Sequence, residues 1–221
     1  MRIANTVFFD LDGPILDVSE KYYRLYCDLL HDEGRQPLSK AEYWDRKRRC
    51  VPDEAILRCS GLEGWSEEFR ELFRARIESV QYLAHDKIWP GVWEMLCGLA
   101  SRSSLVLVTL RCSTELLTWE LGSMKLLPLF HDVLSTAGNG TTHQRAATKA
   151  SLVMRALGSP NPDAWFVGDT ETDVCAGQLL GLRTAAVAFG IRSCERLAAL
   201  SPDLILETPE IFLQWGRSSL P

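Results

Sequence analysis

Two aspartates near the start of the chain have the type and spacing for catalysis or metal binding. Asp10 and Asp12 directly follow an apolar run at residues 7–9 and precede Gly13 and Pro14. Side chains two residues apart in a strand point the same way, so both carboxylates are expected where the strand opens into a loop. Two adjacent like charges are costly unless a cation or a proton lies between them. The pair fits a divalent-metal site, two carboxylates with separate acid–base roles, or a simple aspartate turn.

The hydrophobic pattern divides the chain into a helical block and an alternating part. Between residues 17 and 88 the apolar residues recur at helical spacing and no strand signal appears. Elsewhere short apolar strands alternate with helices, which is typical of a parallel doubly wound α/β sheet that binds ligands at its carboxyl ends. Strands are expected at residues 7–9, 105–110, 130–135, 164–167, 184–189 and 204–206.

The helices that position these strands can also be placed. In the helical block we expect helices at about residues 18–34 and 39–50, the second beginning with a capping box of Ser39 and Glu42. Two more are expected after Pro52 and from Ser66. In the alternating part, helices are expected at about residues 92–99, 113–122 and 149–157, the last after a loop at 138–142, with three more between and after the final strands.

The helical block interrupts the first crossover of the sheet. Nearly a hundred residues separate Asp10 from Thr109, whereas a crossover between parallel strands needs only about a dozen. We therefore expect an α/β core of residues 1–16 and 89–221, with residues 17–88 inserted as an all-helical cap. Such an insertion at the carboxyl end of the sheet is expected to act as a lid over the aspartate pair.

Further polar residues occur at the ends of later strands, and together they resemble a known family. Thr109 ends one apolar strand, Gly168 and Asp169 end another, and Lys149 stands at the predicted start of a helix. This order resembles the four motifs of the haloacid dehalogenase superfamily, which consists mostly of phosphohydrolases. The matching positions are Asp10, Asp12 and Gly13, then Thr109, then Lys149, then Gly168 and Asp169 with Asp173. The resemblance covers essentially the whole chain and is strongest to phosphoglycolate-phosphatase-like members.

The resemblance implies a Rossmann-like fold and a chemical role for each aspartate. Asp10 would attack phosphorus and form an aspartyl-phosphate, and Asp12 would protonate the leaving oxygen and then activate water. Mg²⁺ would be held by Asp10, Asp169 and the backbone carbonyl of Asp12, with Asp173 orienting metal-bound waters or Lys149.

The resemblance also implies how the phosphoryl group is held. Thr109 would bind a phosphoryl oxygen with the help of backbone N–H groups near Gly13 and Leu110, and Lys149 would balance the acidic cluster. Pro14 departs from the family pattern, which has Thr or Val there, so the loop must not need that N–H.

The reaction is predicted to be hydrolysis of a small phosphorylated metabolite by a cytoplasmic, magnesium-dependent phosphatase. Within the resembled superfamily, an aspartate at position 12 favours a phosphatase or a phosphomutase, because the dehalogenases lack an acid there and the transport ATPases carry Thr. A phosphomutase acting on a sugar phosphate, and a non-catalytic relative that binds a phospholigand or a partner, stay open as alternatives.

Composition limits the partners. The net charge of −5 argues against a general nucleic-acid or membrane-surface binder, and no apolar stretch is long enough to cross a membrane. Residues 1–5 lack the apolar region of a signal peptide, and seven scattered cysteines without a Cys-x-x-Cys pair indicate free thiols in a reducing compartment. We expect a monomer or a small homo-oligomer.

The sequence leaves the residues that select the substrate open. The densest basic run is Arg46, Lys47, Arg48 and Arg49. It is either a solvated helix face or a site for an anionic group, with Tyr43 and Trp44 beside it to stack on the substrate. Arg111, two residues after Thr109, is a second candidate at the edge of the cleft.

Overall fold

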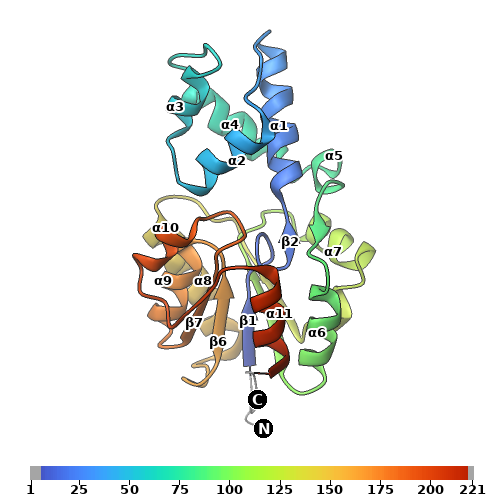
Figure 1. The fold of residues 1–221 in the computed structure, drawn as a ribbon. Helices are drawn as coiled ribbons and strands as arrows, with labels where there is room; N and C mark the ends of the chain where they lie inside the picture. The colour runs from blue at the N-terminus through green and yellow to red at the C-terminus, as the bar shows by residue number, and fades with distance from the viewer. Residues whose placement is uncertain (1–5, 219–221) are drawn as a thin grey trace. The chain divides into compact units, whose positions relative to one another are not determined.

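The computed structural model describes residues 6–218, and it contains a parallel sheet whose strand order is β5-β4-β1-β6-β7-β8 (Figure 1). All five neighbouring pairs are parallel. The strands are β1 (Thr6–Phe9), β4 (Ser104–Thr109), β5 (Asp132–Ser135), β6 (Trp165–Gly168), β7 (Arg183–Val187) and β8 (Leu204–Leu206). A separate two-stranded sheet pairs β2 (Leu16–Asp17) with β3 (Lys87–Ile88).

The order of the strands places a topological switch point at β1. The chain passes from β1 to β4 and β5 on one side, then returns to β6, β7 and β8 on the other. Phe9 of β1 is in register with Leu107 of β4 and with Val167 of β6, so these three strands end near one another. Ligands bind at such a point in open α/β sheets. The predicted doubly wound α/β fold class is confirmed.

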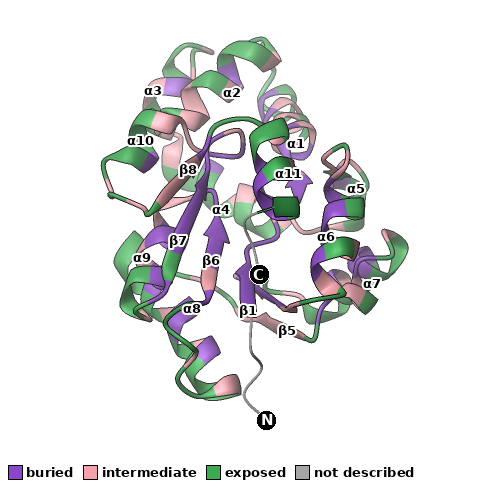
Figure 2. Ribbon diagram, turned by 60° about the horizontal axis from the view of Figure 1, so that its bottom comes forward, coloured by how far each residue is buried: buried purple, intermediate pink, exposed green. Residues whose placement is uncertain are grey.

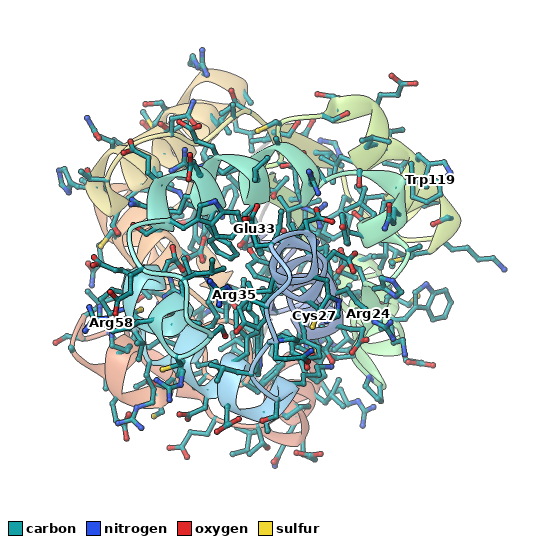
Figure 3. The ribbon with its side chains drawn as sticks, turned by 90° about the horizontal axis from the view of Figure 1, so that it is seen from above. Arg24, Cys27, Glu33, Arg35, Arg58 and Trp119 are labelled. Carbon is teal, nitrogen blue, oxygen red and sulfur yellow. The ribbon has the colours of Figure 1, made fainter. Side chains whose placement is uncertain are left out.

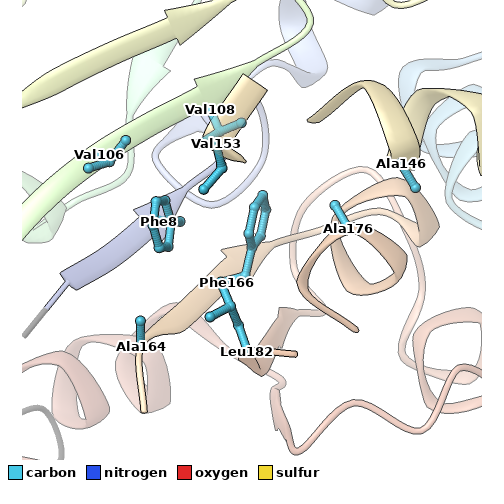
Figure 4. Close-up of a cluster of buried hydrophobic side chains, with 9 residues drawn as sticks. All are labelled: Phe8, Val106, Val108, Ala146, Val153, Ala164, Phe166, Ala176 and Leu182. Atoms are coloured by element: carbon cyan, nitrogen blue, oxygen red, sulfur yellow. The ribbon is translucent and has the colours of Figure 1, made fainter. Parts of the chain in front are cut away.

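One face of the sheet is covered by α8 (Thr142–Leu157) and α9 (Glu171–Leu179). Phe8 of β1 and Phe166 of β6 lie on this face with ring centroids 6.1 Å apart. The cluster, drawn in Figure 4, consists of Phe8, Val106, Val108, Ala146, Val153, Ala164, Phe166, Ala176 and Leu182. Burial of these apolar side chains holds the two helices on the sheet.

The opposite face is covered by α11 (Pro209–Ser218), which packs against α6 (Val92–Ala100). Trp165 precedes Phe166 in β6 and therefore points to the other side, where its ring meets Trp215 of α11 at 5.4 Å. Strands β1, β6 and β7 are largely buried between the two helical layers, while the outer sides of α10 (Cys194–Ala198) and α11 are exposed (Figure 2). The layer arrangement explains why these strands read as nearly continuous apolar runs. The remaining core elements are α7 (Thr114–Ser123) and the short helix η1 (Leu127–Leu129).

Residues Val18–Lys87 form a second compact unit, which is all-helical except for the first residue of β3 at its end. Its helices are α1 (Ser19–Asp32), α2 (Lys40–Arg48), α3 (Asp53–Arg58), α4 (Ser66–Arg76) and α5 (Val80–Leu83). The predicted apolar stripe of the first helix is confirmed, since Leu25, Tyr26, Leu29 and Leu30 are buried. The predicted capping box of Ser39 and Glu42 is also present at the start of α2.

One residue of the basic run of this unit, Lys47, is held by several contacts within the unit. Lys47 lies over the rings of Tyr22 and Phe73 at 5.9 and 5.8 Å, and it pairs with Asp53 at 3.5 Å. Tyr43 is not exposed for stacking on a substrate. It is buried in the core of the unit, where its ring stacks on that of Tyr26 with the centroids 4.2 Å apart. The helical period turns Tyr43 inward, away from the exposed charges around it.

Other basic residues of the unit lie at its surface. Arg24, Arg35 and Arg58 are labelled in Figure 3, where they come from α1, the segment after it and α3. Arg24 pairs with Glu20 at 2.7 Å and Arg58 with Glu54 at 3.8 Å, both four residues apart on one helix. Exposed pairs of this kind contribute little to stability.

A buried ion pair inside the second unit gives a testable stability effect. Lys21 Nζ and Asp86 Oδ2 are in contact, and both side chains are almost completely buried. Removing one partner leaves a buried charge, so we expect Lys21→Met to lower the free energy of unfolding by about 3–5 kcal/mol in urea titrations. The double variant Lys21→Met/Asp86→Leu should lose less than the single one. An equal or larger loss in the double variant would contradict this account.

The main correction to the expected elements concerns the helix that carries Lys149. The sequence predicted that this helix begins at Lys149, whereas α8 begins at Thr142 and Lys149 lies in its middle. Thr141 and Gln144 form a capping box that starts the helix earlier, and the first two turns are too polar to show an apolar stripe. Elsewhere β5 begins two residues later than expected, β7 ends two residues earlier, and α5, β2 and β3 were not predicted.

Three remaining predictions concern the whole chain. The expected absence of a signal peptide at residues 1–5 lies outside the described residues. Among the described residues, no helix combines the length and apolar character needed to cross a membrane. The seven cysteines all lie within the described residues, and none of them forms a disulfide.

Candidate active site

The first motif lies in a tight turn at the carboxyl end of β1. Asp10 N donates to Val167 O at 2.9 Å and so extends the ladder to β6. The turn that follows is closed by the N–H groups of Gly13, Ile15 and Leu16, which donate to Leu16, Leu11 and Leu11 carbonyls respectively. Pro14 lies inside this turn. Proline has no N–H to donate, and none of these hydrogen bonds needs a donor at position 14. Its departure from the family pattern is therefore accommodated.

Asp10, Lys149 and Asp173 form a buried charged cluster beside this turn. Lys149 Nζ lies 2.8 Å from Asp10 Oδ1 and 2.6 Å from Asp173 Oδ1. The Lys149 side chain is 3% exposed. A lysine is buried this deeply only when paired, so its long side chain, reaching from the middle of α8, is held in place by two carboxylates.

The titration of the cluster reflects its burial. Burial raises the pKa of Asp10 from 3.8 to about 7, with Lys149 acting in the opposite direction and Asp173 and Asp12 adding to the rise. Burial opposes the charge on Lys149, but the carboxylates of Asp10 and Asp173 outweigh it and raise the pKa of Lys149. At Asp10 the effect of burial, with a smaller contribution from the neighbouring carboxylates, thus outweighs the effect of the Lys149 ammonium group on the pKa.

Asp169 has the features of a metal ligand. It follows β6, is fully buried, and its Oδ2 accepts a hydrogen bond from Ile191 N. Its Oδ1 accepts no hydrogen bond from any residue of the described chain. Burial and the neighbouring charges of Asp173 and Asp10 raise the pKa of Asp169 well above its usual range. A buried, uncompensated carboxylate oxygen is what a bound cation would satisfy.

Glycines line this carboxylate on two sides. A Cβ on Gly13 would lie 1.8 Å from Asp169 Oδ2, and a Cβ on Gly190 would lie 2.2 Å from the same atom. Gly13 also has φ +104°, a value that other residues rarely adopt. The two glycines therefore give Asp169 its place in the cluster.

Carboxylate oxygens of Asp10, Asp169 and Asp173 lie within 4.8 Å of one another, which fits one divalent cation. Both oxygens of Asp173 already accept hydrogen bonds, Oδ1 from Lys149 and Oδ2 from the N–H and hydroxyl of Thr170. The two hydrogen bonds from Thr170 to Asp173 Oδ2 also cap the start of α9. Asp10 and Asp169 are thus the better placed ligands, with Asp173 fixing Lys149.

Asp12 and Arg111 form an ion pair that the sequence did not predict. Arg111 Nε donates to Asp12 Oδ2 at 2.7 Å and Nη2 to Oδ1 at 2.6 Å. Arg111, which the sequence offers as a candidate at the edge of the cleft, is 5% exposed and also lies 3.5 Å from Glu120. Thr109 is buried at the end of β4, and Leu110 follows it outside the strand.

Gly13 lies in the turn whose backbone N–H groups are predicted to help bind phosphate. Its own N–H donates to the carbonyl of Leu16 at 2.9 Å. Gly13 contributes through its missing side chain and through its carbonyl, which accepts a bond from Trp89 Nε1 at 2.7 Å.

Sequence reasoning missed Trp89, Gly190 and Ile191. Gly190 and Ile191 follow β7, the neighbour of β6, so the same search for residues beyond strand ends finds them. Trp89 precedes a Pro-Gly break and gave no chemical signal, since an indole N–H is a structural donor.

The chain is similar to known hydrolases along most of its length. A family model described as haloacid dehalogenase-like hydrolase matches residues 7–187. A phosphoglycolate phosphatase from Synechococcus elongatus is 30% identical over 208 residues, covering 94% of this chain and 95% of that protein. A pyrophosphatase from Halalkalibacterium halodurans is 25% identical over 217 residues, covering 92% of this chain and 93% of that protein. A solved haloacid dehalogenase-like hydrolase from Streptococcus pneumoniae has a TM-score of 0.72 at 20% identity, covering 95% and 97% of the two chains.

A switch-point site with crowded carboxylates and a buried lysine, together with phosphatase relatives along most of the chain, defines a phosphohydrolase. The chain belongs to the haloacid dehalogenase-like hydrolase family.

Proposed function

We propose that this protein is a magnesium-dependent phosphatase that hydrolyses a small phosphomonoester through an aspartyl-phosphate on Asp10. The observation that carries the proposal is the buried arrangement of Asp10, Lys149 and Asp173 beside the unsatisfied Oδ1 of Asp169. Such a cluster suits a nucleophilic carboxylate that must stay ionised next to a bound cation and an anionic substrate.

In the first step, a carboxylate oxygen of Asp10 attacks phosphorus as the bond to the leaving oxygen breaks, and Asp12 gives that oxygen a proton. In the second step, Asp12 takes a proton from a water that attacks the phosphorus, and Asp10 is regenerated as phosphate departs. Lys149 favours the ionised form of Asp10 and holds its side chain in place. Thr109 and the Leu110 N–H bind phosphoryl oxygens.

Asp10, Asp169 and the Asp12 backbone carbonyl would hold Mg²⁺ in this proposal. When bound, the ion would neutralise negative charge on the phosphoryl group. Among the residues of the cluster, Lys149 is the one cationic side chain that could share this role. The unpartnered Asp169 Oδ1 and the crowding of three carboxylates support this ligand set.

We propose a substrate whose leaving group is small, with 2-phosphoglycolate as the first candidate. The relatives named for their activity are a phosphoglycolate phosphatase and a pyrophosphatase. Both names specify substrates that carry a second anionic group close to the bond that is broken.

The test is release of inorganic phosphate from a panel of 2-phosphoglycolate, pyrophosphate and sugar phosphates, with and without Mg²⁺. We expect release that depends on Mg²⁺ and is fastest with 2-phosphoglycolate. Asp163→Asn, at an exposed acid of the same unit, serves as the matched control and should behave like wild type. Isomerised sugar phosphate without phosphate release would point to a phosphomutase, and no turnover of any substrate would contradict the proposal.

The protection given by Mg²⁺ should depend on pH. In the metal-free protein the raised pKa of Asp10 means that its stabilising contribution is present at low pH and is lost as pH rises through about 7. Mg²⁺ binds the ionised carboxylates, so the increase in Tm that it causes should be larger at pH 8 than at pH 6. Differential scanning fluorimetry at both pH values measures this. An increase that is equal at the two pH values, or one that survives in Asp169→Asn, would contradict the assigned ligands.

A further inference from the structure

The ion pair between Arg111 and Asp12 is the feature of the site that the mechanism does not yet use. The guanidinium donates to both oxygens of Asp12, at 2.7 and 2.6 Å. Glu120 of α7 lies on its other side at 3.5 Å and is itself buried. The Asp12 side chain is 19% exposed while that of Arg111 is 5% exposed, so the pair is reached from the Asp12 side.

This arrangement differs from the one that catalysis needs. A carboxylate that accepts hydrogen bonds on both oxygens from one guanidinium has no oxygen directed solely at a leaving group. During turnover Asp12 must turn from Arg111 to the ester oxygen. Arg111 would then stay buried after losing the carboxylate that accepts both of its short hydrogen bonds, which is unfavourable unless another anion takes the place of Asp12.

We propose that a carboxylate on the leaving group replaces Asp12 on Arg111, so that a substrate with this second anion releases Asp12 for catalysis. This inference rests on the proposed function and deepens it by naming the substrate feature that the site selects. The fork of Nε and Nη2 that now holds the planar carboxylate of Asp12 fits a planar substrate carboxylate equally well.

The position of Arg111 also limits where that carboxylate stands in the substrate. Asp12 must reach the ester oxygen, and Arg111 touches Asp12 directly. A group that binds Arg111 while Asp12 meets the ester oxygen is therefore attached close to that oxygen. The class selected is phosphate esters of short 2-hydroxy acids, whereas a neutral leaving group would leave Asp12 on Arg111.

Binding of a non-hydrolysable analogue tests the exchange without relying on turnover. The probe is 3-phosphonopropionate, in which a methylene replaces the ester oxygen of 2-phosphoglycolate, and its neutral partner is the corresponding amide. By titration calorimetry with Mg²⁺, wild type should bind the acid at least about 30-fold more tightly than the amide. Arg111→Met should reduce this preference to less than about threefold. Arg183→Met, at an exposed arginine of the same unit, should keep the wild-type preference.

The variant must be shown to fold, because Arg111→Met leaves Glu120 buried beside an apolar side chain. If circular dichroism shows loss of structure, Arg111→Met/Glu120→Gln replaces it, with the same expected loss of preference. Equal binding of acid and amide by wild type, or a preference that persists in the arginine variants, would overturn the proposal.

Kinetics separate this proposal from a purely positioning role for Arg111. In Arg111→Met the ratio of kcat/KM for 2-phosphoglycolate to that for its amide should fall by the same factor as the binding preference. An equal fall for both substrates, with the ratio unchanged, would mean that Arg111 only orients Asp12 and would overturn the exchange. If wild type releases no phosphate but still binds the acid more tightly than the amide, the proposed function is refuted, while the replacement of Asp12 on Arg111 by a ligand carboxylate is not.

Discussion

Asp10→Asn will lower kcat for phosphate release at least about 10⁴-fold, because an amide cannot act as the nucleophile that carboxylate chemistry requires. Asparagine has the same shape, and the backbone bond from residue 10 to Val167 is retained. The measurement is kcat with the preferred substrate of the panel at saturating Mg²⁺.

The fold should survive this substitution. Since burial is the main cause that raises the pKa of Asp10, a neutral side chain removes a charge that the site disfavours. We expect the Tm of the metal-free variant to stay within about 3 °C of wild type. Activity within tenfold of wild type in a purified, folded variant would exclude Asp10 as the nucleophile.

Gly13→Ala will lower Mg²⁺ affinity by about 10–100-fold, as expected when the surroundings of a metal ligand are disturbed. The added Cβ would lie 1.8 Å from Asp169 Oδ2, so the carboxylate must move. The φ of +104° adds backbone strain. Calorimetric titration with Mg²⁺ measures the loss.

Gly181→Ala separates the two effects. Gly181 also has positive φ, at +67°, but nothing lies within 4 Å of the Cβ that alanine would add. This control should be destabilised by backbone strain and still bind Mg²⁺ like wild type. Wild-type Mg²⁺ affinity in Gly13→Ala would contradict the role of Gly13 in placing Asp169.

The site residues that lie at the ends of strands were predictable from the sequence. Asp10 and Asp169 each follow an apolar strand and Thr109 ends one, and parallel strands bring their carboxyl ends to one edge of the sheet. Local pattern and topology suffice for such residues. The apolar stripe of α1 and the capping box of α2 were predictable for the same reason, because each is encoded within a few neighbouring residues.

The start of the helix carrying Lys149 was mispredicted because the apolar stripe begins two turns after the capping box. The Lys149 side chain nevertheless reaches Asp10 from the middle of α8, at 2.8 Å. Helix boundaries are less certain than helix existence when the first turns are polar.

The pairing of Arg111 with Asp12 was not predictable from the sequence. The two residues are 99 positions apart, and the contacts of Arg111 with Asp12 and with Glu120 of α7 exist only in the folded chain. The contact of Gly13 and Gly190 with Asp169 is likewise a property of packing, which a glycine in a sequence does not reveal.

Trapping the covalent intermediate tests the central claim most directly. A reaction with 2-phosphoglycolate is stopped within milliseconds and treated with borohydride, which reduces an acyl phosphate to the alcohol. Peptide mass spectrometry then reads residue 10. The proposed mechanism predicts homoserine at position 10 in wild type with substrate and none without it. Phosphate release with residue 10 unmodified, or modification at another residue, would contradict nucleophilic attack by Asp10.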